Sequence, residues 1–174
     1  MPELTLVKQC SPTLANKKTG SLFRVKYATK NDMIYDLKQC NQKFLKKGIC
    51  FLPLNYDNHS ALIYVFRPSR LRADFKRPQV QTILSMLGYK DFDYAHCLQE
   101  LKLRLKGSDF PHEIGLFLGD PINDMAGFIN HQGHDYKAIG MWKVYDDVEL
   151  ANHLFTEYKE LQISFLRPFI RGLH

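Results

Sequence analysis

The amino-acid sequence predicts an α/β or α+β fold: a single layered domain, residues 1–174, in which about five strands of a mixed sheet are covered by about six helices. Three observations lead to this prediction. Short apolar runs alternate along the chain with amphipathic segments of helical spacing. The length of 174 residues suits one domain that can bury a core without disulfides or metal ions. The 45% hydrophobic content is too high for a disordered chain.

Two hydrophobic runs predict a hairpin at the centre of the sheet. Residues 49–54 and 61–66 flank a polar cluster, 55–60, that is typical of a turn. The unbroken apolar run 61–66 indicates a strand buried on both faces. Pro53 indicates that the first strand of the pair lies near an edge or ends early. Residues 22–27 alternate like a half-buried third strand.

Helical segments surround these strands. Ser11 and Pro12 suit the N-cap and the first position of a short helical turn over 10–16. Asn31 is expected to cap a helix that Gly48 ends. Three further amphipathic segments predict helices over 68–76, 78–88 and 94–106.

The last third of the chain predicts a βαβ unit. The apolar run 114–119 predicts a strand, and Asp120 is expected to cap the helix that follows. Another strand is expected over 138–145, before a last helix capped by Asp146 or Asp147. Strand residues expected in the core are Leu62, Ile63, Val65, Leu116, Phe117, Leu118 and Ile139.

Composition and motifs exclude several classes of protein. No run of about 18 apolar residues is present, so no membrane partner is expected, and the N-terminus lacks a signal-peptide pattern. The four scattered cysteines form no CxxC pair, which predicts a reducing, cytoplasmic location with most thiols buried. Phosphate-binding motifs and HExxH are absent, and the cluster His131, His134 and Asp135 is weak evidence for a metal. We therefore predict no metal site, while cofactor and oligomeric state stay undefined.

The chain contains the sequence blocks CSPTLA with KTGSLF, ALIYVFRP, FPHEIGLFLGDP and WKVY. In these blocks it resembles a bacterial family catalogued as a domain of unknown function. The resemblance extends from about Cys10 to Lys159, and the segment after Lys159 departs from the ending of that family. The resemblance implies no activity, because none is assigned to the family.

Two of these blocks supply candidate catalytic residues. In both, polar side chains lie beside proline and glycine, an arrangement that is typical of pockets on rigid scaffolds. Cys10 precedes the predicted helical turn, whose backbone N–H groups favour a thiolate. His112 is the candidate acid or base, and Glu113 is its candidate partner. The alternatives are an inert buried thiol and a histidine–glutamate pair that only ties down a loop, since neighbouring strand residues face opposite ways.

A pocket for a small ligand, formed by the turn at 10–14 and the segment 112–120, is the leading hypothesis. With Cys10 and His112 it would carry out a thiol-dependent reaction of unknown class. Phe128, Trp142 and Tyr145 are interpreted as core residues rather than as a pocket for a planar ligand. Ligand-binding residues are expected at the junctions beside these segments: Thr13, Lys18, Gly119 and Asp120.

A nucleic-acid-binding or regulatory module without catalysis is the alternative hypothesis. Residues 1–90 carry 16 Lys and Arg against 5 Asp and Glu, whereas residues 91–174 carry 8 against 13. This split favours attraction between the two halves of one domain, but it also suits an acidic partner. The densest basic segment has the residues that would contact phosphates: Arg67, Arg70, Arg72, Lys76 and Arg77. No helix-turn-helix, RNA-recognition or zinc-finger signature accompanies it.

Overall fold

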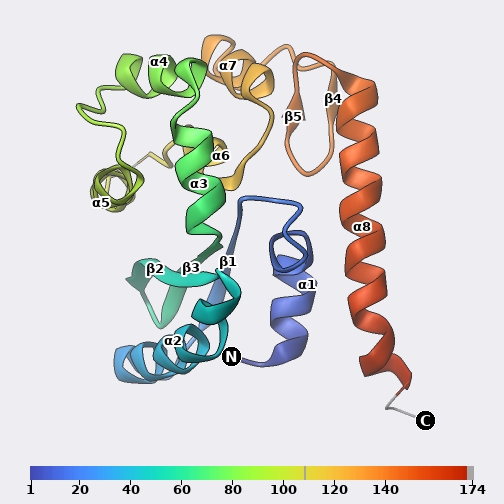
Figure 1. Ribbon diagram of the computed structural model, residues 1–174. Coiled ribbons are helices and arrows are strands. Elements are labelled where there is room, and N and C mark those ends of the chain that lie inside the picture. Colours follow the sequence, from blue (N-terminus) through green and yellow to red (C-terminus); the bar gives the residue numbers. More distant parts are fainter. Residues whose placement is uncertain (108, 172–174) are drawn as a thin grey trace.

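The computed structural model describes residues 1–107 and 109–171 (Figure 1). In chain order the elements are α1 (Glu3–Leu14), β1 (Gly20–Lys26), α2 (Lys30–Phe44), the 3-10 turn η1 (Leu45–Lys47), β2 (Cys50–Asp57), β3 (Ser60–Phe66), α3 (Pro68–Phe75), α4 (Pro78–Met86), α5 (Tyr94–Arg104), α6 (Ile114–Leu118), α7 (Ile122–Asn130), β4 (Ala138–Ile139), β5 (Lys143–Val144) and α8 (Val148–Arg171).

The main sheet is antiparallel and has the order β1-β3-β2. β3 is therefore central, and the predicted β2–β3 hairpin is confirmed. β2 lies at an edge, where its register shifts between Pro53 and Asn55, because proline cannot donate to the ladder. β4 and β5 form a separate small hairpin. The mixed helix-and-strand class is confirmed, but the sheet is smaller than the five-stranded mixed sheet expected, and the described residues form no βαβ unit.

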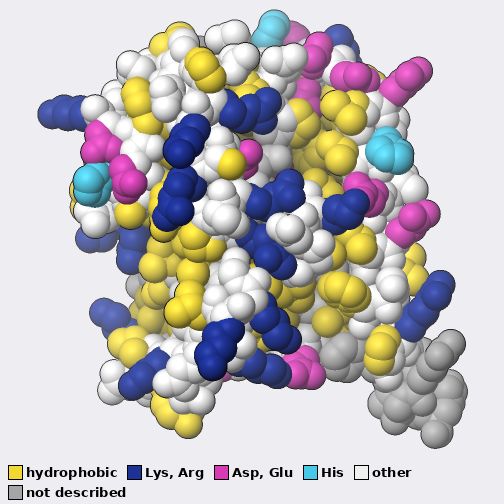
Figure 2. Space-filling view, viewed as in Figure 1, with side chains coloured by type: hydrophobic (Ala, Val, Ile, Leu, Met, Phe, Trp, Pro, Cys, Tyr) yellow, Lys and Arg dark blue, Asp and Glu magenta, His cyan; other side chains and the backbone are white. Residues whose placement is uncertain are grey.

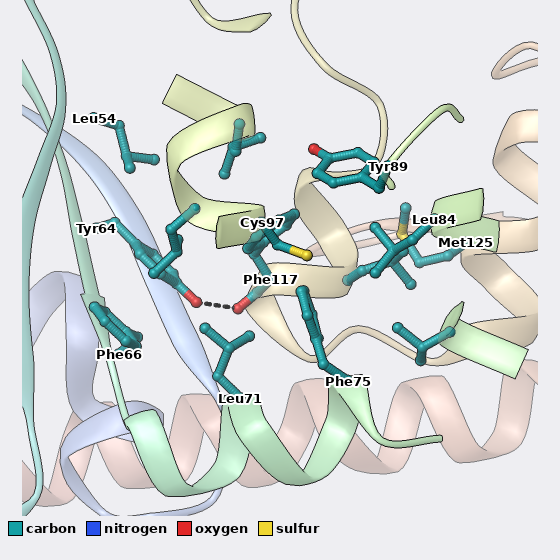
Figure 3. Packing of buried hydrophobic residues seen from close by; sticks show 14 of the residues in the cluster. Leu54, Tyr64, Phe66, Leu71, Phe75, Leu84, Tyr89, Cys97, Phe117 and Met125 are labelled. Carbon is teal, nitrogen blue, oxygen red and sulfur yellow. Dashed lines mark hydrogen bonds between the residues drawn. The ribbon is translucent and has the colours of Figure 1, made fainter. Parts of the chain in front are cut away.

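β3 divides the core into two clusters, because successive side chains of a strand point to opposite faces. Its residues Ala61, Ile63 and Val65 join a cluster with buried side chains of α1 and α2. Its residues Leu62, Tyr64 and Phe66 join a larger cluster that side chains of α3 to α7 close (Figure 3). The sheet is thus covered by helices on both faces, as predicted.

The run 114–119 is a short helix, α6, and the predicted strand there is wrong. A short apolar run has no periodicity that separates a strand from a buried helix. Gly119, with φ +78°, ends the helix in the left-handed conformation. The side chains of Leu116 and Phe117 pack into the larger cluster. The Tyr64 hydroxyl of β3 donates to the Phe117 carbonyl and fixes α6 beside the sheet (Figure 3).

The segment 138–145 is a tight hairpin and not the single strand predicted. The chain turns at Gly140, where a side chain would overlap the ring of Phe155 in α8. Ile139 is consequently 64% exposed, so its predicted place in the core is wrong, and Leu118 is only half-buried. The other expected core residues are buried: Leu62, Ile63, Val65, Leu116 and Phe117.

α1 is a 12-residue helix rather than a short turn over 10–16, so Cys10 lies in its second half and not before its N-terminus. Pro12 lies inside the helix and has no N–H for the carbonyl of Lys8. That carbonyl accepts from the side chain of Gln162 in α8, which packs along α1 (Figure 1). Asp147 caps α8 by accepting from the backbone N–H of Leu150. Of the two residues predicted as caps, Asp146 and Asp147, the second therefore has this role.

None of the helices within residues 1–107 and 109–171 combines enough length with enough apolar character to cross a bilayer.

Candidate functional site

A cavity of about 310 Å³ opens between α6, α7 and the β4–β5 hairpin. Most of its wall is apolar, and the carboxylates of Asp120 and Asp124 reach it. Its volume is at the lower end of the range of small-molecule sites, which are typically about 300–1,000 Å³. The lining residues are Phe110, Pro111, His112, Ile114, Gly115, Asp120, Asp124, Met125, Phe128, Trp142 and Lys143.

Asp120 forms a buried ion pair with Lys18, whose Nζ lies 3.0 Å from Oδ1 of the carboxylate. The two side chains are 8% and 10% exposed. Burial raises the pKa of Asp120 above its ordinary value, Lys18 opposes this shift, and the nearby Asp124 carboxylate adds to it. The Lys18 ammonium also lies 5.7 Å from the centre of the Trp142 ring and 5.9 Å from that of Tyr158. The structure therefore brings together two of the predicted ligand-binding residues.

Asp124 organises the hairpin wall of the cavity. Its Oδ2 accepts from Trp142 Nε1 at 2.8 Å, and its Oδ1 accepts from the backbone N–H groups of Tyr145 and Asp146 at 2.8 and 2.9 Å. Both oxygens are thus engaged with protein donors, which compensates for their burial. This carboxylate fixes the Trp142 ring at the cavity and has a structural role.

Two glycines allow the close packing at the base of the cavity. A Cβ on Gly115 would lie 2.1 Å from Met125 Sδ and 3.1 Å from Asp120 Oδ2. Gly119, predicted to bind ligand, packs instead against Thr19, where a Cβ would lie 2.6 Å from Oγ1. Asp120 is not the N-cap of α7, because Pro121 occupies that position and the Asp120 side chain turns to Lys18.

The mouth of the cavity is formed by aromatic rings and two basic side chains. Phe110 is 49% exposed there, and His112 packs on Phe128 with 5.2 Å between ring centres. Lys143 donates to the Gly133 carbonyl at 2.7 Å, and its ammonium lies 5.8 Å from the centre of the Phe128 ring. His112 is exposed, so its predicted place in a pocket agrees with its position at the rim.

Glu113 points away from His112 and is held inside the fold. It accepts from the Tyr89 hydroxyl at 2.9 Å and lies 3.3 Å from Arg104 Nη1. Arg104 in turn donates to the Leu87 carbonyl and stacks over the Tyr89 ring. Glu113 therefore joins α5, the end of α4 and α6, and the structure does not pair it with His112.

Cys10 and Thr13 lie away from the cavity. Cys10 is completely buried in the cluster on the α1–α2 face of the sheet, whereas the cavity lies on the other side, among the helices that close the larger cluster. Burial raises the pKa of the Cys10 thiol far above its ordinary value, which disfavours the thiolate, so the predicted electropositive setting is wrong. Thr13 is buried too and shares a 2.8 Å hydrogen bond with Ser21.

The basic segment is divided between structural and exposed side chains. Arg67 donates to the carbonyls of Thr13 and Leu14 at 2.7 Å, and Arg70 donates to that of Asn16 at 2.7 Å. These bonds add donors to carbonyl groups at the C-terminal end of α1 and just beyond it, where the Thr13 carbonyl also accepts from the backbone N–H of Asn16. Figure 2 shows Lys and Arg side chains on the face that carries α3. The exposed members of the predicted set are Arg72, Lys76 and Arg77.

Comparison with known families decides the affiliation of the chain. The family described as "Protein of unknown function (DUF3793)" matches residues 6–174. The chain belongs to the DUF3793 family. Its match includes the segment after Lys159, which the sequence resemblance had left out. No match was found among curated proteins or among solved structures.

Several residues that line this cavity escaped prediction as ligand-lining residues, among them Trp142, Phe128 and Asp124. The two aromatic residues were interpreted as core, because their spacing suits a packed strand or helix equally well. Asp124 carries the one available signal, an acidic residue on the apolar face of a predicted helix. Among residues 1–107 and 109–171, no group of three or more His, Cys, Asp or Glu side chains is placed to hold a metal ion.

Proposed function

We propose that this DUF3793 protein binds a small molecule with a compact apolar body in the cavity between α6, α7 and the β4–β5 hairpin. The observation that carries the proposal is a cavity of about 310 Å³, lined mostly by apolar side chains, with a buried carboxylate at its base. A few polar groups within an apolar wall are typical of small-molecule sites. The segment 112–120, which the sequence predicted to form part of a ligand pocket, contributes His112, Ile114, Gly115 and Asp120 to the lining.

The thiol-dependent reaction is not part of the proposal, because Cys10 is buried in a different part of the core. Iodoacetamide labelling of the folded protein at pH 8 checks this, with Cys10 expected to stay unmodified and the half-buried Cys50 to react first. All four cysteines are free, which supports the proposal that the protein acts in the reducing cytoplasm.

Trp142 provides the assay, because it is the single tryptophan of the chain and lines the cavity. Its fluorescence is recorded while the protein is titrated with 2-phenylethanol, which has one aromatic ring and one hydroxyl group. We expect a saturable change in emission. A change that grows linearly with concentration, without saturation, would contradict the proposal.

A pair of exposed aromatic residues serves as variant and control. Phe110→Ala removes part of the cavity wall and should weaken 2-phenylethanol binding by about fivefold, since loss of ~1 kcal/mol of apolar contact has that effect on Kd. Tyr35→Ala removes an aromatic side chain that is 67% exposed on α2, remote from the cavity (Figure 1), and should leave Kd unchanged. Equal Kd values for the two variants would place the binding site elsewhere.

A further inference from the structure

We propose that the ligand of this cavity is a small organic amine, bound as its ammonium ion against Asp120 with its apolar body among the aromatic rings. This inference rests on the proposed function and names the chemical class of the ligand. It follows from the hydrogen-bonding capacity that the protein leaves open in the cavity, from the balance of charge around it, and from the rings in its wall.

Asp120 is the carboxylate with an acceptor oxygen left for a ligand. Among the described residues, its side-chain partner is Lys18, which lies next to Oδ1. Oδ2 lies beside Gly115, another residue of the cavity wall, where a Cβ would come within 3.1 Å of it. Asp124 cannot serve in the same way, because three N–H donors already engage its two oxygens.

The charge around Asp120 favours a cation. Lys18 balances one of the two carboxylates, Asp120 and Asp124, and the ammonium of Lys143, which also lines the cavity, is engaged by the Gly133 carbonyl. On its other side Asp120 reaches a second hollow of about 320 Å³, whose lining adds Asp146 and Asp147 against a single Arg77. An ammonium ion at Asp120 Oδ2 would offset the cost of burying this carboxylate.

The aromatic wall suits the same class of ligand. Ammonium groups are attracted to the faces of aromatic rings, and rings also receive the apolar body of the ligand. The protein already uses this contact at both ends of the cavity, where Lys18 lies near the Trp142 ring and Lys143 near the Phe128 ring. The Lys143 ammonium is directed to the Gly133 carbonyl at the rim, so it does not occupy Asp120.

The test compares three probes of equal ring size by Trp142 fluorescence: phenethylamine, 2-phenylethanol and phenylacetate. We expect phenethylamine to bind at least about tenfold more tightly than the alcohol, because its full positive charge is attracted to the carboxylate, whereas the alcohol is neutral. Phenylacetate should bind more weakly than the alcohol, because its charge repels that of Asp120. Wild-type protein alone decides this ranking, so the test does not depend on a variant that folds.

Asp120→Asn then assigns the preference to one side chain. The amide keeps the size of the carboxylate but not its charge, so phenethylamine should lose about tenfold in affinity, whereas the neutral 2-phenylethanol should lose clearly less. Asp57→Asn, at an exposed position of β2, is the matched control and should change neither affinity.

The outcomes separate the two proposals. Saturable binding of 2-phenylethanol together with equal or weaker binding of phenethylamine would overturn the amine proposal and leave the ligand-binding function standing. Saturable binding of none of the three probes would overturn both. A tenfold preference for the amine that survives in Asp120→Asn would also contradict the assignment to Asp120.

Discussion

Glu113 and Asp120 are two buried carboxylates only seven residues apart, yet their surroundings differ. Glu113 receives the Tyr89 hydroxyl and the Arg104 guanidinium, both of which are tied to neighbouring helices. Asp120 has Lys18 on one side and the cavity on the other. The first carboxylate is engaged by two donors of neighbouring elements, whereas Lys18 is the side-chain partner of the second within the described residues, and we propose that its other oxygen accepts from a ligand. Burial of a charged group by itself therefore does not indicate a binding site; what matters is whether the protein supplies all of its partners.

Phe117, between the two carboxylates, gives the largest expected effect. Its ring is fully buried and packs edge-on against Phe75 at 4.9 Å between ring centres. Phe117→Ala should lower the free energy of unfolding by about 3–5 kcal/mol through lost burial and the cavity left behind. Urea denaturation measures this loss, and a loss below about 1 kcal/mol would show that α6 does not anchor both regions.

Glu113→Ala should have the next largest effect. It leaves the Tyr89 hydroxyl and Nη1 of Arg104 without their acceptor, which should lower the free energy of unfolding by about 2–3 kcal/mol. Thermal unfolding should show a midpoint lower by roughly 5–10 °C for a chain of this size. Glu113→Gln, which keeps an acceptor for Tyr89, should recover part of the loss. An unchanged midpoint in Glu113→Ala would remove the structural role assigned to this residue.

Asp120→Asn should cost less, about 1–2 kcal/mol. Lys18 loses its charged partner, but the amide oxygen still accepts a hydrogen bond, and the rings of Trp142 and Tyr158 stay near the ammonium. Denaturation of Asp120→Asn and Glu113→Ala under the same conditions gives the comparison directly. A greater loss for Asp120→Asn would reverse the roles of the two carboxylates.

His112→Ala should have the smallest effect, within about 0.5 kcal/mol, because the side chain is exposed and makes no side-chain hydrogen bond within the described part of the chain. A midpoint many degrees lower would assign His112 to the architecture of the loop instead of to the rim of the cavity.

Local patterns sufficed to predict much of the fold. The β2–β3 hairpin and the helices α2 to α5 could be predicted, because period and turn residues are close together in the sequence. The predicted cap of α2 was wrong, since Thr29 and not Asn31 is the N-cap, accepting from the backbone N–H of Asp32. The helical state of 114–118 could not, since the contact that holds it comes from Tyr64, far away in the chain. Gly140 likewise acts through Phe155 of α8.

The candidate site shows the same division. Lys18 and Asp120 were each expected to bind ligand, because each lies in a short glycine-containing junction, 17–20 and 119–121. Their pairing, and the role of Trp142 beside them, depends on how α8 and the hairpin pack over the end of α1. Cys10 shows the converse: its position in the sequence suggested a helix N-terminus, but the helix begins at Glu3 and buries the thiol.

The most direct test of the difference between the two carboxylates is the rise in thermal midpoint that saturating phenethylamine causes in Glu113→Ala and in Asp120→Asn. A ligand that binds only the folded state stabilises it by RT ln(1 + [L]/Kd), so the rise reports binding separately from the stability of each variant. We expect Glu113→Ala to melt at a lower temperature than wild type but to keep the wild-type rise. Asp120→Asn should lose most of it. A full rise in Asp120→Asn, or its loss in Glu113→Ala, would contradict the assignment of Asp120 to the ligand and of Glu113 to the fold.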